Sequence, residues 1–278
     1  MTSRLSFRWL GIAGIELSYH NQVLLIDPCL TRIPFWRLWY GKLHSDHSLV
    51  AQVIPHADHI LITHSHYDHL LDAPGLAITH GAGIYGSPNT CALSKLSGVP
   101  SVQIHPVQSG VTLDLGCFSV KVIPANHRRI PFFLPGSLSP HLRSPFTARQ
   151  YRLDLCFSFR ISVDGFSLLV NAGSPPHLIP AADVLFLHPF YSNTHYRQLL
   201  EAVRPRVAIP VHWDDLWRPL SQPPQPSFQP PDLAFPPLRR VNLALFQQAL
   251  LRLDPTLQVL LPERLKEYNL SIFGSVLP

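Results

Sequence analysis

The sequence predicts an α/β protein built as a four-layer αβ/βα sandwich, with two mixed β-sheets facing each other and helices outside. Strand-like runs rich in β-branched and aromatic residues occur in both halves of the chain, and each half continues into helix-like segments. The 278 residues are 46% hydrophobic and only 14% charged, which supplies a large core and excludes a mostly disordered chain. We expect one domain over residues 1–278.

The N-terminal half alternates strands and helices. Residues 7–28 indicate two strands joined by a turn at His20-Asn21, and residues 59–64 (HILITH) form the short apolar run typical of a strand buried on both faces. A polar, histidine-rich loop follows, and helix-like sequence begins at Leu70. The segments IYGSP, CALSKL and SVQIHPV then repeat the strand, helix, strand order.

The C-terminal half begins with hairpin-like sequence and ends in alternating strands and helices. Residues 111–127 and 153–173 are typical of hairpins, with Asp164-Gly165 as the turn of the second. One segment stands apart, because eight prolines lie in residues 219–237. We expect an extended excursion there that forms a stiff surface loop, with a lid or a partner-docking site as the alternatives.

Composition narrows the class of protein further. The four cysteines form no CxxC pair, which favours free thiols and a reducing cytoplasm. No apolar run approaches the roughly 18 residues of a membrane span, and the N-terminus is typical of a strand and not of a signal peptide. The net charge of +5 mildly favours anionic substrates but is too diffuse to indicate nucleic acid.

The strongest chemical signal is the hexapeptide His-Ser-His-Tyr-Asp-His at residues 64–69. Side chains two apart in an extended segment project to the same side, so His64 and His66 can reach one cation. Asp68 and His69 follow after the chain turns and can face a second one. Imidazole and carboxylate suit zinc, manganese or iron, whereas burying four polar groups without such a partner costs free energy. A solvated histidine-rich loop is the alternative.

At these residues the sequence resembles the metallo-β-lactamase superfamily, whose HxHxDH motif matches THSHYDH. The surrounding segments LGIAGIEL, LLIDP, VIPANH and IPVHW are most similar to the branch that contains L-ascorbate-6-phosphate lactonase and N-acylphosphatidylethanolamine phospholipase D. The resemblance extends from about residue 6 to about residue 214 and implies the metallo-β-lactamase fold and a metal-dependent hydrolase.

The resemblance also implies a ligand set. His64, His66 and His127 would bind a first divalent ion, and Asp68, His69 and His212 a second, with zinc favoured over manganese or iron. Asp27 would orient a ligand histidine, unless it only closes a turn at a strand end.

One departure from the family pattern concerns the aspartate that bridges the two metals. The corresponding stretch here is LLVNAGSPP, in which Gly173 aligns with that position. The amide of Asn171 is a weak neutral substitute. His188, on the neighbouring strand, is a further contributor or else an ordinary core histidine. One or two ions are therefore expected.

Arginine and aromatic residues flank this site. Arg128 and Arg129 follow His127 and are expected to bind an anionic or amphiphilic substrate. Residues 32–42 (RIPFWRLWYGK) indicate an aromatic lining at the mouth of the site, a peripheral membrane contact, a core plug or a homo-oligomer interface. Arg143, Arg149 and Arg152 continue this basic character along the Pro/Ser-rich loop of residues 135–150, which we expect to form a flexible cover over the cleft.

These features favour a hydrolase in which a metal-bound hydroxide attacks an anionic ester, a phospholipid-like phosphodiester or a lactone, with Asp68 holding the nucleophile and moving its proton. A non-catalytic metal-binding scaffold or sensor is the second hypothesis, supported by the missing bridging carboxylate. A metal-dependent nuclease is the third, and it is disfavoured because the chain has only four lysines.

Overall fold

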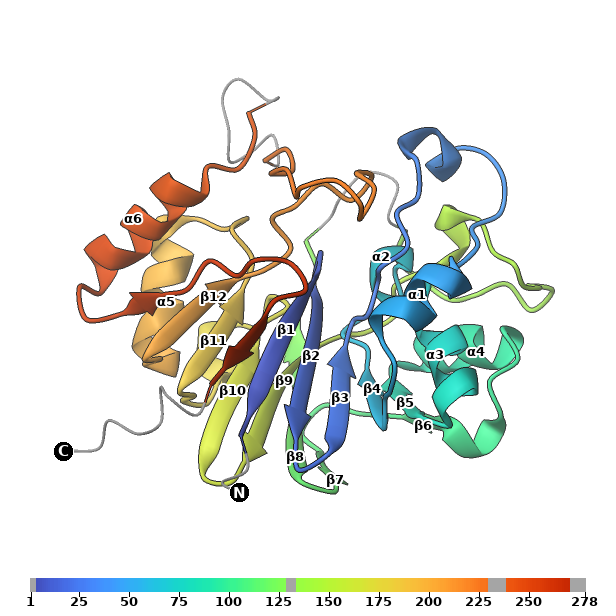
Figure 1. Ribbon diagram of the computed structural model, residues 1–278, viewed down its shortest axis with the longest axis horizontal. Helices are drawn as coiled ribbons and strands as arrows, with labels where there is room; N and C mark the ends of the chain where they lie inside the picture. Colours follow the sequence, from blue (N-terminus) through green and yellow to red (C-terminus); the bar gives the residue numbers. More distant parts are fainter. Residues whose placement is uncertain (1–3, 129–133, 230–238, 271–278) are drawn as a thin grey trace.

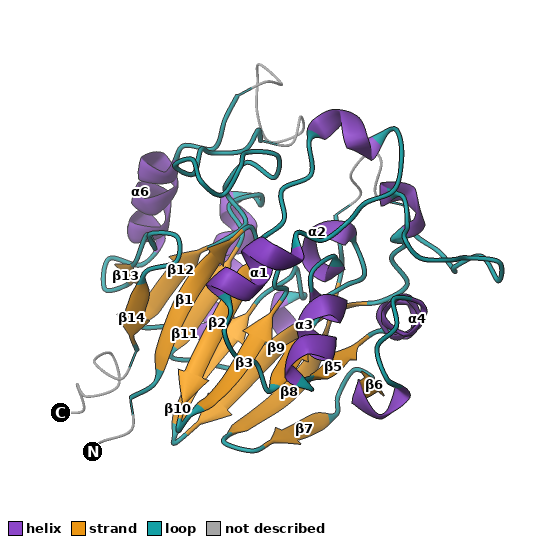
Figure 2. Ribbon diagram, turned by 45° about the vertical axis from the view of Figure 1, so that its right-hand side comes forward, coloured by secondary structure: helices purple, strands orange, loops and turns teal. Residues whose placement is uncertain are grey.

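The computed structural model describes residues 4–128, 134–229 and 239–270 (Figure 1). Within these residues two seven-stranded sheets face each other, and helices cover the outer face of each (Figure 2). The four-layer αβ/βα sandwich expected from the sequence is confirmed.

The first sheet belongs mainly to the N-terminal half of the chain. Its strand order is β14-β1-β2-β3-β4-β5-β6, with antiparallel pairing from β14 to β3 and parallel pairing from β3 to β6. The strands are β1 Ser6–Gly11, β2 Gly14–Tyr19, β3 Gln22–Ile26, β4 His59–Leu61, β5 Gly83–Gly86, β6 Ile104–Pro106 and β14 Glu267–Asn269.

The prediction of two strands in residues 7–28 was wrong, because three are present. The chain turns twice: between β1 and β2, where Gly11 (φ 96°) and Ile12 (φ 51°) are left-handed, and at His20-Asn21. Only the second turn carries a polar turn signal in the sequence. The first depends on Gly11, which tolerates a positive φ without steric cost.

The second sheet has the order β13-β12-β11-β10-β9-β8-β7. It is antiparallel from β7 to β10 and parallel from β10 to β13. The strands are β7 Thr112–Leu115, β8 Phe118–Ala125, β9 Cys156–Val163, β10 Phe166–Val170, β11 Val184–Leu187, β12 Val207–Pro210 and β13 Gln258–Val259.

Polar side chains cap the start of several helices. Asp46, Ser87, Ser192 and Asn242 each accept a hydrogen bond from a backbone N–H of the first turn of α1, α4, α5 and α6. The α-helices are α1 His47–Val53, α2 Tyr67–Leu70, α3 Ala73–His80, α4 Pro88–Leu96, α5 Asn193–Val203 and α6 Leu243–Leu253, and the 3₁₀ helices are η1 Phe35–Leu38, η2 Ser101–Gln103, η3 Ala148–Gln150 and η4 Pro176–Leu178.

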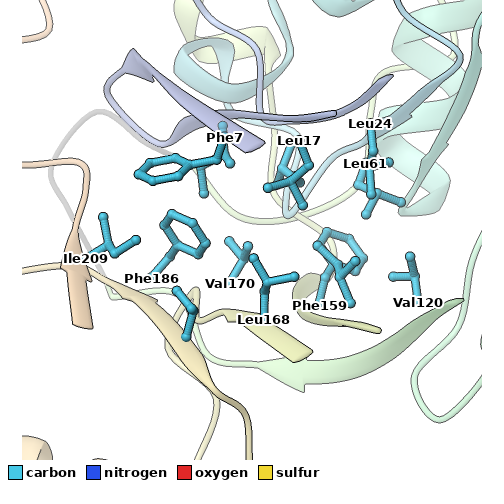
Figure 3. Close-up of a cluster of buried hydrophobic side chains, with 14 of the residues drawn as sticks. Phe7, Leu17, Leu24, Leu61, Val120, Phe159, Leu168, Val170, Phe186 and Ile209 are labelled. Atoms are coloured by element: carbon cyan, nitrogen blue, oxygen red, sulfur yellow. The ribbon is translucent and has the colours of Figure 1, made fainter. Parts of the chain in front are cut away.

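The main core lies between the two sheets. Figure 3 shows Phe7, Leu17 and Leu24 of the first sheet pointing toward Phe159 and Phe186 of the second. A second apolar cluster lies beneath α1 to α4, and a third lies between the second sheet and α5 and α6. Together these three clusters bury both faces of each sheet.

The described part of the proline-rich segment is fastened to the body of the protein. Asp214 pairs with Pro226 and Phe228 pairs with Arg240 in isolated β-bridges, and the Arg264 guanidinium donates to the Leu220 carbonyl. The interpretation of this segment as a stiff surface loop stays a prediction, and residues 230–238 lie outside the described residues. Among the described helices, none is both long and apolar enough to cross a bilayer.

Candidate metal centre

The sequence-predicted site residues follow strands that end at one edge of the sandwich. Asp27 follows β3, the 64–69 loop follows β4, and His127 follows β8. Asn171, His188 and His212 follow the parallel strands β10, β11 and β12. Because parallel strands place their carboxyl ends at the same edge, residues up to 185 positions apart in the sequence meet there.

The 64–69 loop joins β4 to α2 and is buried throughout. His66 precedes α2 with an extended backbone (φ −67°, ψ 153°), and Asp68 and His69 lie in the single helical turn that follows. The helix therefore begins at Tyr67, earlier than the predicted Leu70. This change of backbone direction gives the two histidines before the turn one orientation and the two ligands after it another.

His64, His66 and His127 form the first group. Their ligand nitrogens all lie within 4.8 Å of one another. The ring of His127 lies 4.5 Å from the ring of His64 and 4.7 Å from that of His66, measured between centroids. Three imidazoles converging in this way fit one divalent ion.

Asp68, His69 and His212 form the second group, again with ligand atoms within 4.8 Å of one another. The Asp68 Oδ2 atom lies 3.5 Å from His69 Nε2 and 3.5 Å from His212 Nε2. The two groups are adjacent, because the ring centroids of His64 and His69 are only 3.9 Å apart. His212 reaches the group from a left-handed backbone conformation (φ 59°) directly after β12.

Asp27 holds His69 in place. Its Oδ2 atom lies 2.8 Å from His69 Nδ1 and accepts a hydrogen bond of 2.6 Å from the Thr63 hydroxyl, while Oδ1 accepts one of 2.7 Å from the Thr63 amide. With Nδ1 bonded to a carboxylate, Nε2 of His69 is left facing Asp68. This is the arrangement that orients metal-binding histidines. Sequence reasoning did not single out Thr63, although it stands inside the THSHYDH motif.

The electrostatics of the site suit cation binding at neutral pH. Burial and the neighbouring imidazoles lower the pKa of His66 to about 3 and that of His127 to about 4, and lower the pKa of His64 well below 6.5. These three rings are therefore neutral and offer lone pairs. Burial opposes ionisation of Asp68, but His69 and His212 lower its pKa below the usual range, so it is a carboxylate.

The buried atoms His64 Nε2 and Asp68 Oδ1 have no hydrogen-bond partner among the described residues. An unsatisfied buried nitrogen and carboxylate oxygen cost free energy unless another group completes them. One such atom lies in each group. The donor set, its burial and these two atoms fit a pair of divalent ions.

Residues 171–174, where the superfamily pattern would place a bridging carboxylate, make other contacts in this structure. Asn171 is buried, and its Oδ1 accepts from the Ser158 hydroxyl and from the amides of Gly173 and Ser174. Gly173 has φ +101°, and a Cβ atom there would lie 2.6 Å from the Asn126 carbonyl oxygen and 2.6 Å from the Tyr191 hydroxyl. Asn171 therefore closes its own turn, and position 173 has no room for a side chain.

His188 lies beside the second group but outside it. Its ring is 5.0 Å from the His212 ring, and burial together with His212 lowers its pKa well below 6.5. Arg128 is partly buried and donates a hydrogen bond of 2.8 Å to the Phe190 carbonyl, and Arg129 lies outside the described residues.

The sequence profile of the family described as "Beta-lactamase superfamily domain" matches residues 22–169, more than half of the chain. The chain belongs to this superfamily. The match takes in Asp27, the 64–69 loop and His127. The predicted membership of the metallo-β-lactamase superfamily is confirmed, and the narrower assignment to the lactonase and phospholipase D branch stays a prediction.

Two curated relatives are similar in sequence to part of this chain. A "UPF0173 metal-dependent hydrolase" of Methylocella silvestris is 34% identical over 119 residues, 43% of this chain and 46% of the relative. Another from Cupriavidus necator is 29% identical over 226 residues, 74% of this chain and 72% of the relative. The chain thus spans about half the length of the first of these curated relatives.

A solved structure shows the same fold over nearly the whole chain. Igni18, described as a novel metallo hydrolase from the archaeon Ignicoccus hospitalis, superimposes with a TM-score of 0.62 at 16% identity, covering 95% of this chain and 97% of that one. At this identity the likeness establishes the shared fold.

Proposed function

We propose that this superfamily member is a metal-dependent hydrolase that acts at the centre formed by residues 64–69, His127 and His212. The observation that carries the proposal is the convergence of two ligand groups, each with an unsatisfied buried atom, at one edge of the sandwich. The names of the relatives from Methylocella silvestris and Cupriavidus necator support the same reaction class.

Bound divalent ions would supply a water of lowered pKa and would polarise the carbonyl or phosphoryl oxygen of the substrate. The residues of this chain set up that reaction. Asp68 has an unpaired, buried Oδ1, which would hold the attacking water, accept its proton and pass that proton to the leaving group. Asp27 keeps the His69 ring fixed through Nδ1, and the burial of His64 and His66 excludes bulk water from the inner side of the centre.

We infer an anionic and amphiphilic substrate, namely an ester, a phosphodiester or a lactone. Arg128 lies next to His127 and is anchored to the Phe190 carbonyl, so its charge is held at the rim. Phe190 lies 6.1 Å from the His212 ring, which brings an apolar surface beside the second group. A guanidinium next to an aromatic wall suits a substrate with an anionic head and an apolar portion.

A non-catalytic metal-binding scaffold is the second candidate, and the 171–174 turn is the observation that favours it. That turn carries no carboxylate, and the side-chain oxygen of Asn171 accepts hydrogen bonds from Ser158 and from the backbone of the turn. A scaffold of this kind would bind divalent ions with the same groups but would show no turnover.

We place the enzyme in a reducing compartment. All four cysteines are free thiols, and Cys29, Cys91 and Cys156 are buried. Buried thiols of raised pKa, as burial produces at Cys91 and Cys156, are poor nucleophiles.

The test is hydrolysis of bis(p-nitrophenyl) phosphate, a p-nitrophenyl ester and an acyl lactone by protein loaded separately with zinc, manganese or iron. Asp68→Asn is expected to lower kcat on the accepted substrate by about 10²–10⁴-fold without unfolding the protein. The matched control is Asp46→Asn, an exposed carboxylate at the start of α1. Activity that survives chelation and Asp68→Asn would overturn the proposal, and metal binding without turnover on any of the three would favour the scaffold.

A further inference from the structure

Four large aromatic side chains project into solvent from η1 and the two residues that follow it. Phe35 is 49% exposed, Trp36 57%, Trp39 45% and Tyr40 74%. We call these four residues the aromatic prong. Leu38, in the same short helix, is buried and fastens the prong to the apolar cluster beneath it. The alternative of a core plug is wrong for these four residues, because the structure places them outside the core.

The two segments that surround the aromatic prong carry only positive charges. No acidic residue occurs from Pro28 to Ser45, nor from Leu134 to Leu153 on the neighbouring loop. The Arg37 guanidinium lies 4.9 Å from the Trp36 ring and that of Arg149 lies 6.0 Å from the Trp39 ring. With Lys42, these cations form a basic collar around the prong.

The two loops are one structural unit. The Leu43 amide donates to the Phe146 carbonyl at 2.7 Å, and Phe146 is buried in the same cluster as Leu38. In Figure 1 the η1 segment extends from the body of the protein on the side where α2 lies. The expectation that this loop covers the cleft stays a prediction; Phe146 anchors the loop in the apolar cluster.

The aromatic prong lies at the same end of the molecule as the metal centre. The Phe35 ring packs edge-on against Trp217, at 5.0 Å, and Trp217 lies next to Tyr67, which stands between His66 and Asp68. On the other side, the Ser65 hydroxyl donates to the Arg152 carbonyl at 2.5 Å. A surface held by the prong would therefore face the rim of the centre.

We propose that the aromatic prong and its basic collar dock the protein onto an anionic lipid bilayer, with the metal centre facing the lipid surface. Amphipathic aromatic rings partition at the level of the lipid headgroups, and arginine and lysine are attracted to anionic lipids. Charge complementarity favours this occupant over a second copy of the chain, because the collar of one copy would meet the collar of another. Docking itself is independent of the proposed hydrolysis.

The test uses tryptophan fluorescence. Of the five tryptophans, Trp36 and Trp39 are exposed, whereas Trp9 and Trp213 are buried. Vesicles of phosphatidylcholine and phosphatidylserine that carry brominated acyl chains are expected to quench the wild-type emission at low salt. Trp36→Phe with Trp39→Phe should still sediment with these vesicles but lose the quenching, since phenylalanine keeps the apolar surface and removes the reporter.

Charge and specificity are tested by sedimentation with vesicles. Arg37→Gln with Arg149→Gln is expected to weaken binding to phosphatidylserine vesicles by about tenfold. The matched control is Arg197→Gln with Arg252→Gln, two exposed arginines on α5 and α6. Binding should fall in high salt and be weak on pure phosphatidylcholine.

Three outcomes would overturn the proposal. The first is wild-type protein that stays in the supernatant with anionic vesicles. The second is equal loss of binding in the two arginine variants. The third is a dimer in analytical ultracentrifugation that the two Trp→Ala substitutions dissociate, which would assign the aromatic prong to a second copy. Far-UV circular dichroism of each variant establishes that it is folded.

Discussion

Replacing Asp27 with asparagine tests whether its carboxylate serves the second metal group. Asp27 is 1% exposed and makes hydrogen bonds to the Thr63 amide, the Thr63 hydroxyl and His69 Nδ1. Its backbone is left-handed (φ 47°), a conformation that asparagine also adopts readily, so the change adds little strain. The effect is therefore confined to the side-chain contacts.

The magnitude follows from those contacts. An asparagine oxygen still accepts from the Thr63 amide, and the Thr63 hydroxyl can turn to accept from the new amide nitrogen. The charge-assisted bond to His69 is lost, which costs about 1.5–3 kcal/mol of folding free energy. Because His69 is no longer oriented, we expect the affinity of the Asp68, His69 and His212 group for zinc to fall about 10–100-fold.

The assay is competitive titration of zinc against a chromophoric chelator, with urea unfolding alongside. Asp72→Asn is the matched control: Asp72 is equally buried and accepts hydrogen bonds from the amides of Leu30 and Thr31, but it lies outside both metal groups. Both variants should lose stability, and only Asp27→Asn should lose affinity at one site. Equal zinc affinities in the two variants would refute the reasoning.

Three further predictions concern stability and the neighbours of the centre. In the presence of a chelator, the free energy of unfolding should fall as the pH drops below 6.5, by up to about 1.4 kcal/mol per pH unit for each of His66 and His127, because burial lowers their pKa values and the unfolded chain takes up protons first. The raised pKa of His69 changes the stability only above pH 6.5. Urea unfolding at pH 7 and at pH 5 measures the difference. Gly173→Ala should cost at least about 1–2 kcal/mol, seen as a lowered Tm, because φ is +101° and the new methyl would lie 2.6 Å from a backbone carbonyl oxygen; an unchanged Tm would contradict this geometry. His188→Gln should leave the metal content unchanged, since His188 lies outside both groups, and loss of an ion in elemental analysis would show that it is a ligand.

The layers of the fold could be predicted from the sequence because buried strands such as 59–61 are continuous apolar runs and hairpins such as 156–170 carry an Asp-Gly turn. The extra strand at the N-terminus could not, because its turn at Ile12 contains no polar turn residue. The early start of α2 at Tyr67 was missed for a related reason. A four-residue helix has too few residues for a helical periodicity.

The position of the candidate centre could be predicted because the segments THSHYDH, VIPANH and IPVHW resemble the superfamily pattern, and Asp27 could be assigned through the segment LLIDP. The roles of Asn171 and Thr63 could not, because they depend on which backbone amides their side chains face. The steric reason for glycine at 173 was equally hidden. It arises from Asn126 and Tyr191, which are distant in sequence.

The central claim is that His64, His66 and His127 hold one divalent ion while Asp68, His69 and His212 hold another. Elemental analysis of zinc-reconstituted protein tests it most directly. We predict two ions per chain in the wild type, one in His127→Ala, one in His212→Ala and none in the double variant. A wild-type count of zero, or a count that neither substitution changes, would contradict the account.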